Sequence, residues 1–387
     1  MRRVLLTLLL IFNFSSAEDV VVGAEDFDSY LPLLKGKRVA LVVNHTSLIG
    51  DRHLLYFLLD NNINVVKVFA PEHGFRGILD AGESVSDGED GMRNIKIISL
   101  YGKHKKPSNR DLSDVDIVVF DIQDVGVRFY TYLSTLHYVM ESVAENGLPI
   151  VVLDRPNPNG ARIDGEVLNF RYKSFIGLHP VPILYGMTIG EYARMINGEG
   201  WLKGNLKADL KVIPLQNWNH NMRYHLKVKP SPNLPNELSI YLYPSLALFE
   251  GTIFSVGRGT NMQFQVYGDP HYHNRNFSFT PRPMFGSRHP KHSGKICYGV
   301  DLRDLPARDT SFYLKGELNL CYLVEAYNNY PYKRKFFLKG GFFNRLAGSD
   351  KLKKQIEAGL SIDEIRKSWE NGLRQFREIR AKYLLYP

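Results

Sequence analysis

Acidic, imidazole and amide side chains follow four apolar runs of the chain, each close to the point where the run ends. Arranged by run, these residues are Asn44, then Glu72, His73 and Arg76, then Asp121, Asp124 and Arg128, and finally Asp154 with Asn157. A cleft lined by several carboxylates suits a reaction that needs a general acid together with a base or a stabilising anion, and glycoside cleavage is the leading example. Polar residues are common in any loop, so this prediction depends on several carboxylates reaching the same place.

Glu72 is the first candidate for a proton donor. It lies in the segment Pro71–Gly77, where His73, Gly74 and Phe75 crowd the chain. A carboxyl group in a cramped turn beside an aromatic ring is placed to act as a general acid.

Two other kinds of chemistry use side chains of these types. A divalent metal ion is the rival for the same polar residues, but His45, Glu72, His73, Asp121 and Asp124 follow no known ligand spacing, and we expect no metal site. A nucleotide cofactor would need a glycine-rich phosphate loop after the first run, where the chain reads NHTSLIGD. The GxxxxGK[ST], HExxH and GxSxG signatures are also absent, and we expect no cofactor.

A second polar cluster lies in the later half of the chain. It contains Glu250, Arg258 and Thr260, and Gly257 and Gly259 flank the arginine. Glycines let the backbone approach a ligand closely, and a guanidinium offers a planar fork to a carboxylate. The alternative is a tight turn with a surface arginine.

The elements that must position these residues read as alternating strands and helices. Short apolar runs occupy Arg38–Asn44, Asn64–Phe69, Ile95–Leu100, Asp116–Phe120 and Pro149–Leu153. Helical spacing covers Asp51–Asn61, Leu133–Asn146 and Ile189–Asn197. Runs of this kind suit strands that are covered on both faces, which predicts an α/β fold with a Rossmann-like parallel sheet. Ligands bind beyond the carboxyl ends of such strands, so Glu72, Asp121, Asp124 and Asp154 are expected at one edge.

The proline-dense stretch Pro230–Pro235 predicts a domain boundary, because it suits neither a helix nor a central strand. We expect the Rossmann-like domain over residues 18–235 and a smaller α+β domain over residues 236–387. The second domain contains the strand-like fragment Ser311–Leu314 and ends in a charged helical tail from Asp350 to about Tyr383.

Residues 1–17 predict a secretory signal peptide. Arg2 and Arg3 precede the apolar run Val4–Phe14, and Ser15-Ser16-Ala17 offers small residues before Glu18. The apolar run is too short for a membrane anchor, so we expect an exported protein, periplasmic or secreted, without stable membrane insertion after cleavage.

Charge and cysteine content add weaker constraints. The 387 residues carry 49 basic and 40 acidic side chains; without Arg2 and Arg3, 47 basic residues remain against 40 acidic ones. The surplus suits an anionic envelope or an acidic ligand, and no basic stripe interleaved with aromatics points to nucleic acid. Export would permit a disulfide between Cys297 and Cys321, but two buried free thiols are an equal alternative.

Several motifs together resemble those of the exo-β-N-acetylmuramidase family known as NamZ, from about residue 30 to the end of the chain. They are FAPEHGFRG and AGE (69–77, 81–83), FDIQDVGVRFYTY (120–132), VLDRPNPNG (152–160), GMTIGEYA (186–193), PSPNLPN (230–236), FEGTIFSVGRGT (249–260) and the closing LAGSDKL with YLLYP. Departures from the family pattern, such as Asn159 before Gly160 and 254–256 before Gly257, touch no proposed catalytic group.

The resemblance implies an exported glycoside hydrolase that releases N-acetylmuramic acid from the non-reducing ends of peptidoglycan fragments. Its substrates would be peptidoglycan-derived disaccharides and muropeptides, and its smaller domain would close over a cleft in the Rossmann-like domain. By motif, the implied catalytic residues are Glu72 as the acid, with His73, Asp121 and Asp124. The implied substrate-binding residues are Asn44, Arg76, Glu83, Arg128, Tyr130, Tyr132, Asp154, Asn157, Glu250, Arg258 and Thr260.

Muramic acid carries a lactyl carboxylate, for which an arginine fork is the natural partner, with Arg258 ahead of Arg128 and Arg76. Two readings from other classes remain open. A periplasmic muropeptide-binding protein would use the same cleft without needing Glu72, whereas a nucleotide-dependent oxidoreductase or transferase would need the missing phosphate loop.

Overall fold

The N-terminal part of the molecule is built on one mostly parallel sheet. The computed structural model describes residues 19–80, 88–89, 94–309 and 311–387. In spatial order the strands are β11 (Asp209–Ile213), β8 (Pro149–Leu153), β7 (Ile117–Asp121), β1 (Val39–Val43), β4 (Val65–Ala70), β6 (Lys96–Ser99) and β5 (Gly88–Glu89). All of these strands are parallel except β5, which is antiparallel to β6. Counted along the chain, the parallel strands follow the Rossmann order 3-2-1-4-5-6, and the predicted fold class is confirmed.

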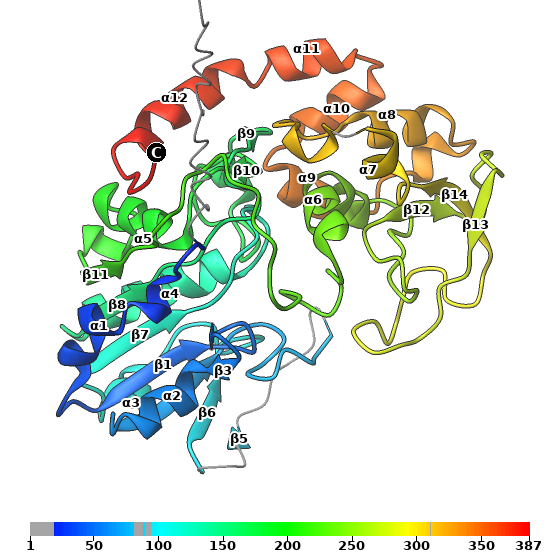
Figure 1. The fold of residues 1–387 in the computed structure, drawn as a ribbon. Coiled ribbons are helices and arrows are strands. Elements are labelled where there is room, and N and C mark those ends of the chain that lie inside the picture. The colour runs from blue at the N-terminus through cyan, green and yellow to red at the C-terminus, as the bar shows by residue number, and fades with distance from the viewer. Residues whose placement is uncertain (1–18, 81–87, 90–93, 310) are drawn as a thin grey trace, which may run out of the picture.

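Side chains of successive strand residues enter two different cores, which is why the strands read as unbroken apolar runs. In β1, Val39, Leu41 and Val43 pack in the core beneath α1 (Phe27–Leu34) and α2 (Leu54–Asp60). Ala40 and Val42 belong to the opposite core, which contains residues of α4 (Tyr132–Glu145) and α5 (Ile189–Gly198). The helices therefore cover both faces of the sheet (Figure 1), with the short α3 (Asn109–Leu112) before β7.

The later part of the chain is a smaller α+β assembly beside the sheet (Figure 1). Its antiparallel sheet has the order β12 (Val266–Asp269), β14 (Cys297–Asp301) and β13 (Phe277–Phe279). Its helices are α6 (Glu237–Leu246), α7 (Leu305–Arg308), α8 (Cys321–Asn328), α9 (Phe342–Ala347), α10 (Lys351–Glu357), α11 (Ile362–Lys367) and α12 (Glu370–Ala381). One hydrophobic core runs continuously from the α4 side of the sheet into this part, so the two parts pack through apolar contacts.

Short elements complete the fold. Two-stranded pairs are formed by β2 (Leu48–Ile49) with β3 (Arg52–His53) and by β9 (Ile163–Asp164) with β10 (Leu184–Tyr185). Short 3-10 helices are η1 (Gly23–Glu25), η2 (Phe170–Tyr172), η3 (Lys203–Asn205), η4 (Ala247–Gly251), η5 (Phe312–Leu314) and η6 (Lys333–Lys335).

Three details differ from the sequence prediction. The strand β11 was missed, because it lies at an edge of the sheet and alternates exposed and partly buried residues. The fragment Ser311–Leu314 is not a strand; Asp309 accepts hydrogen bonds from the backbone N–H and hydroxyl of Ser311, and this turn leads into η5. The charged tail is divided into three helices, the first of which stops before Gly359, where φ is +75°.

The last residues of the chain return to the Rossmann-like part. Figure 1 shows α12 leading the chain back toward α5. There, Glu191 of α5 accepts hydrogen bonds from the backbone N–H groups of Leu385 and Tyr386 at 2.8 and 3.4 Å. Cys297 is buried in β14 and Cys321 is exposed at the start of α8, and both thiols are free. Among the described residues, no helix has the length and apolar character needed to span a membrane.

Candidate active site

A cavity of about 780 Å³ lies between the two parts of the molecule. Glu72, His73, Tyr130 and Thr131 line it from the Rossmann-like part. Tyr243, Glu250, Phe264, Arg258 and Lys291 line it from the C-terminal part. A cavity of this size fits a small ligand, and its chemistry is contributed by both parts of the chain.

Glu72 enters this cavity from the turn that follows β4. The side chain is 9% exposed, and Oε2 accepts a hydrogen bond from the hydroxyl of Thr131, at the start of α4. The next residue, His73, has φ of +70°, a conformation that non-glycine residues seldom adopt. Such backbone strain is concentrated at functional sites, because the surrounding structure must enforce it.

His73 is a neutral imidazole with a defined tautomer. Its Nδ1 lies 2.7 Å from the carbonyl oxygen of Leu79, and a carbonyl can only accept, so Nδ1 carries the proton. Burial lowers the pKa of His73, and the nearby Glu72 opposes this effect only in part. The other ring nitrogen, Nε2, is therefore available as a hydrogen-bond acceptor.

Aromatic side chains form a wall of the cavity. The ring of Tyr243 lies 6.0 Å from that of Tyr130, 5.5 Å from Phe129 and 4.9 Å from Phe264, all nearly edge to face. The hydroxyl of Tyr130 donates to the carbonyl of Pro230 at 2.9 Å, and burial raises the pKa of Tyr130 well above its usual value. This wall offers apolar ring surface with the phenols kept neutral.

Arg258 provides a guanidinium fork at the same cavity. Its Nε donates to Oε1 of Glu250 at 2.6 Å, and its Cζ lies 5.0 Å from the centre of the Phe264 ring. Within the described residues, its terminal nitrogens make no hydrogen bond, so they can donate to a ligand. The flanking Gly257 and Gly259 have φ of +77° and +80°, and a Cβ on Gly259 would lie 2.7 Å from the carbonyl oxygen of Arg282.

Lys291 adds a second cation to the same wall. Its Nζ donates to the carbonyl oxygens of Thr252 at 2.5 Å and Phe254 at 2.8 Å, with a longer contact of 3.4 Å to Phe249. Burial lowers its pKa to about 8, so the ammonium is still mostly protonated at neutral pH. Lys291 and Arg258 line this wall together with the carboxylate of Glu250, so the wall carries an excess of positive charge.

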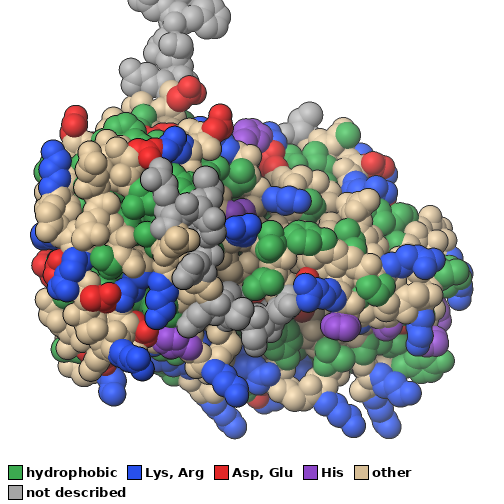
Figure 2. Space-filling view, turned by 90° about the horizontal axis from the view of Figure 1, so that it is seen from below, with side chains coloured by type: hydrophobic (Ala, Val, Ile, Leu, Met, Phe, Trp, Pro, Cys, Tyr) green, Lys and Arg blue, Asp and Glu red, His purple; other side chains and the backbone are tan. Residues whose placement is uncertain are grey.

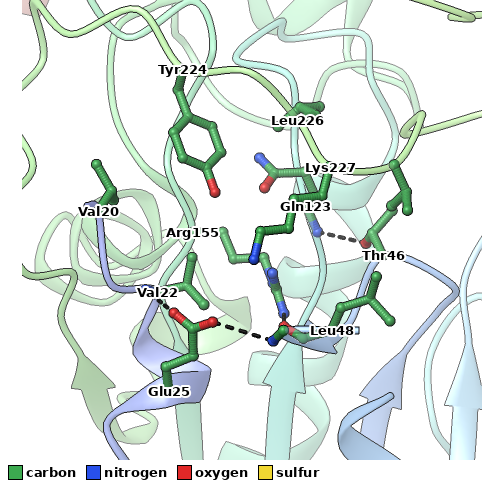
Figure 3. Close-up of a pocket in the computed structure, with 12 residues that line it drawn as sticks. Val20, Val22, Glu25, Thr46, Leu48, Gln123, Arg155, Tyr224, Leu226 and Lys227 are labelled. Atoms are coloured by element: carbon green, nitrogen blue, oxygen red, sulfur yellow. Dashed lines mark hydrogen bonds between the residues drawn. The ribbon is translucent and has the colours of Figure 1, made fainter. Parts of the chain in front are cut away.

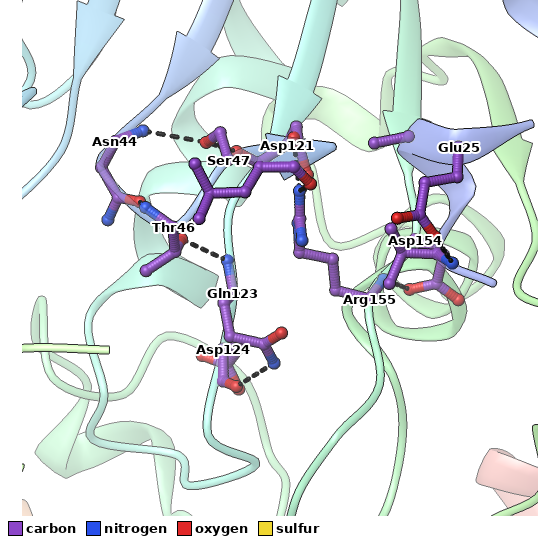
Figure 4. Close-up of polar contacts among 12 residues, drawn as sticks. Glu25, Asn44, Thr46, Ser47, Asp121, Gln123, Asp124, Asp154 and Arg155 are labelled. Atoms are coloured by element: carbon purple, nitrogen blue, oxygen red, sulfur yellow. Dashed lines mark hydrogen bonds and ion pairs between the residues drawn. The ribbon is translucent and has the colours of Figure 1, made fainter. Parts of the chain in front are cut away.

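The other predicted carboxylates follow strands but do not line this cavity (Figure 4). Asp121 is fully buried and binds the guanidinium of Arg155 through both oxygens. Asp124 accepts from the Gly126 N–H and the Tyr185 hydroxyl, and burial raises its pKa to about 6. Asp154 accepts from Tyr386, Thr188 and two backbone N–H groups. All three carboxylates thus hold neighbouring segments together.

The remaining predicted binding residues also lie outside the cavity wall. Asn44 donates to the Tyr132 hydroxyl at 2.9 Å, and the amide of Asn157 donates to the carbonyl of Met187. Arg128 is 2% exposed and donates to the carbonyls of Glu166, Val181 and Leu346, so its terminal guanidinium nitrogens are already bound to the main chain. Thr260 donates to the carbonyl of Gly257, and Arg76 is exposed. Glu83 lies outside the described residues.

The crevice between β1 and β7, where a Rossmann fold binds its nucleotide, is nearly filled. A cavity of only about 50 Å³ remains there, and Figure 3 shows the side chains of Arg155, Lys227 and Tyr224 around it. Among the described residues, no group of three or more His, Cys, Asp and Glu side chains is arranged to hold a metal ion.

The sequence prediction did not single out several residues that line the large cavity. Thr131 and Asn233 both lie inside motifs of the family resemblance, FDIQDVGVRFYTY and PSPNLPN, but neither was assigned a role of its own. Asn233 donates to the carbonyl of Gly286 at 2.7 Å and so joins two loops of the cavity wall. Lys291 had no local signal, because the carbonyls that orient it come from residues 37–42 positions earlier in the chain.

Comparison with known proteins places nearly the whole chain in one family. The models of the N-terminal and C-terminal domains of exo-beta-N-acetylmuramidase NamZ match residues 39–238 and 241–386. The chain is 40% identical over 377 residues to the peptidoglycan beta-N-acetylmuramidase NamZ of Bacillus subtilis strain 168, covering 92% of this chain and 89% of the relative.

Two solved structures of DUF1343 family proteins from Bacteroides fragilis NCTC 9343 have the same fold. The first has a TM-score of 0.88 at 46% identity, and the second has 0.81 at 28%; each comparison covers 95% of this chain and 99% of the other. With two family models that together span the sheet, the cavity and the C-terminal part, the chain belongs to the exo-beta-N-acetylmuramidase NamZ family.

Proposed function

We propose that this protein is an exo-acting β-N-acetylmuramidase, a glycoside hydrolase that releases N-acetylmuramic acid from the non-reducing ends of peptidoglycan fragments. The observation that carries the proposal is that Glu72 and Arg258 line the same cavity, in a chain that is 40% identical to a peptidoglycan beta-N-acetylmuramidase. Glu72 supplies the carboxyl group that can donate a proton, and Arg258 supplies the guanidinium that can bind the carboxylate of the substrate.

Glu72 is the proton donor in this proposal. It transfers its proton to the oxygen that bridges the two sugars while the bond from that oxygen to the anomeric carbon breaks. Water then adds to the anomeric carbon: its oxygen and one hydrogen form the new hydroxyl group, and its other proton returns to the enzyme. Free N-acetylmuramic acid and the shortened fragment are the two products. A positioned general acid contributes about 10² to 10⁴ in rate to such a step.

Arg258 recognises the lactyl carboxylate that distinguishes muramic acid from glucosamine. A guanidinium binds a carboxylate through two parallel hydrogen bonds, and the terminal nitrogens of Arg258 have no other partner among the described residues. The ammonium of Lys291 strengthens the positive charge of the same wall. Tyr130 and Tyr243 offer ring surface on which a sugar can pack.

Export to the periplasm or the surroundings is part of the proposal. The pattern of residues 1–17 supports it. The excess of 47 basic over 40 acidic residues that remains without Arg2 and Arg3 also supports it, because the cell envelope is anionic. Lys and Arg side chains are prominent on the face shown in Figure 2.

A product assay tests the proposed function. The purified protein is incubated with the disaccharide in which N-acetylmuramic acid is β-linked to N-acetylglucosamine, and free sugars are separated and identified. We expect both monosaccharides, and we expect no cleavage when the order of the two sugars is reversed. Binding of the first disaccharide without release of either sugar would contradict the proposal and identify a muropeptide-binding protein.

A further inference from the structure

Thr131 occupies the N-cap position of α4, but its hydroxyl does not cap the helix. A threonine there normally accepts a hydrogen bond from a backbone N–H of the first turn, which stabilises the helix by about 1 kcal/mol. Here the side chain makes no capping bond and donates to Oε2 of Glu72 instead, 59 positions away in the chain.

The first turn of α4 forms without this hydroxyl. The carbonyl oxygen of Thr131 accepts from the backbone N–H groups of Ser134 at 3.0 Å and Thr135 at 3.1 Å, so the first turn closes through the main chain. Thr131 is 8% exposed and lines the large cavity beside Glu72. A threonine at a cavity wall that does not make the usual N-cap hydrogen bond is a candidate for a functional role, because local rules are broken mainly at functional sites.

We infer that Thr131 is a positioning residue that decides which oxygen of Glu72 carries the catalytic proton; this inference rests on the proposed function. A protonated carboxyl group has one hydroxyl oxygen and one carbonyl oxygen, and only the latter is a good acceptor for a hydroxyl. Because the Thr131 hydroxyl donates to Oε2, the proton of Glu72 resides on Oε1. The leaving sugar oxygen therefore receives its proton from a fixed direction.

The hydrogen bond ties Glu72 to a long and mostly buried helix. Glu72 lies in a turn outside any helix or strand, whereas Thr131 begins a helix of 14 residues, most of which are buried. A hydrogen bond from the helix to the carboxyl group restricts the position of the reacting atoms, and misplacement of a catalytic group is costly in rate.

Three variants test the inference. Thr131→Val removes the hydroxyl at nearly constant shape, Thr131→Ser retains it, and Thr135→Val is the matched control one turn along. Thr135 is buried, and among the described residues its hydroxyl donates only to the Thr131 carbonyl, at 3.5 Å. On the natural disaccharide we expect kcat to fall about tenfold or more in Thr131→Val, with KM little changed, and to stay near wild type in Thr131→Ser and Thr135→Val.

The leaving group separates positioning of the acid from a general structural effect. A dinitrophenyl β-N-acetylmuramide needs little protonation of its leaving group, so Thr131→Val should cleave it at close to the wild-type rate. The ratio of the two rates is measured on one protein sample, so partial misfolding cancels. Equal losses on both substrates, or no loss on the disaccharide, would overturn the role of Thr131, whereas an inactive wild-type protein would overturn the proposed function instead.

Discussion

The hydroxyl of Tyr386 donates to Oδ2 of Asp154 at 2.6 Å, although 232 positions separate the two residues. Asp154 follows β8 of the parallel sheet, and Tyr386 is the penultimate residue of the chain. The same carboxylate accepts from Thr188 and from the N–H of Gly190 at the start of α5. A residue that the sequence placed in a substrate site thus fastens the end of the chain to the sheet.

Replacing Tyr386 by Phe should lower the free energy of unfolding by about 1–3 kcal/mol, because a fully buried carboxylate loses one of its donors. Urea denaturation of both proteins measures the difference. Tyr383→Phe is the control, since its hydroxyl donates to the partly exposed Glu199 and water can replace it. Equal losses in the two variants would argue against a special role for the buried contact.

Asp154 should also make stability depend on pH. Burial raises its pKa to about 7, whereas an Asp in an unfolded chain titrates near 3.9. The folded protein therefore holds a proton that the unfolded chain releases, so this contribution is fully present below about pH 4 and is lost as the pH rises through about 7.

The measurement compares the unfolding free energies of wild type and Asp154→Asn from pH 4 to pH 8. The advantage of wild type over the variant should fall by roughly 1.4 kcal/mol per pH unit across much of this window. Asp124 and the buried histidines titrate in both proteins, so their contributions cancel in the difference. A difference that does not change with pH would show that Asp154 is ionised throughout.

Asp121 should affect stability rather than catalysis. Asp121→Asn leaves the guanidinium of Arg155 buried without its carboxylate, and breaking a buried pair costs about 3–5 kcal/mol. Asp116→Asn, which breaks the exposed pair with Arg38, should have a much smaller effect, because water screens exposed charges. Thermal unfolding and kcat per folded molecule are measured together. A fall in kcat at unchanged Tm would indicate that Asp121 takes part in catalysis.

Glu72→Gln should reduce turnover of a β-N-acetylmuramide by at least about 100-fold, because an amide has no proton to donate in a general-acid step. The amide oxygen can still accept from Thr131, so the Tm should remain close to that of wild type. Glu199→Gln, which changes a carboxylate outside the cavity wall, is the matched control and should keep full activity. Turnover near the wild-type value in Glu72→Gln would exclude the role as acid.

Arg258→Ala should remove the preference for muramic acid. We expect kcat/KM on an N-acetylmuramide to fall by roughly 10- to 100-fold relative to that on the matching N-acetylglucosaminide, the value of a hydrogen bond to a charged group. Arg223→Ala is the control, since Arg223 pairs with Glu237 away from the cavity wall. Parallel losses on both substrates would show that Arg258 serves only to pair with Glu250.

The sequence by itself determined the sheet and the segment that carries Glu72. Strands covered on both faces must be apolar at every position, so five of them could be read as continuous runs, whereas the half-exposed edge strand β11 could not. The sequence also predicted a turn at Glu72, because His73 and Gly74 follow it, whereas the positive φ of His73 was decided by the tertiary structure.

Only the tertiary structure decided which of the polar residues after the strands face the cavity. Glu72, Asp121, Asp124 and Asp154 occupy equivalent places in the sequence, yet of these four only Glu72 lines the cavity, while the other three bind Arg155, Tyr185 and Tyr386 in the interior. Thr131 and Lys291 acquire their roles through contacts 59 and up to 42 positions away. Spacing along one strand fixes the edge that a residue reaches, but the direction of its side chain depends on which other segments supply its hydrogen-bond partners.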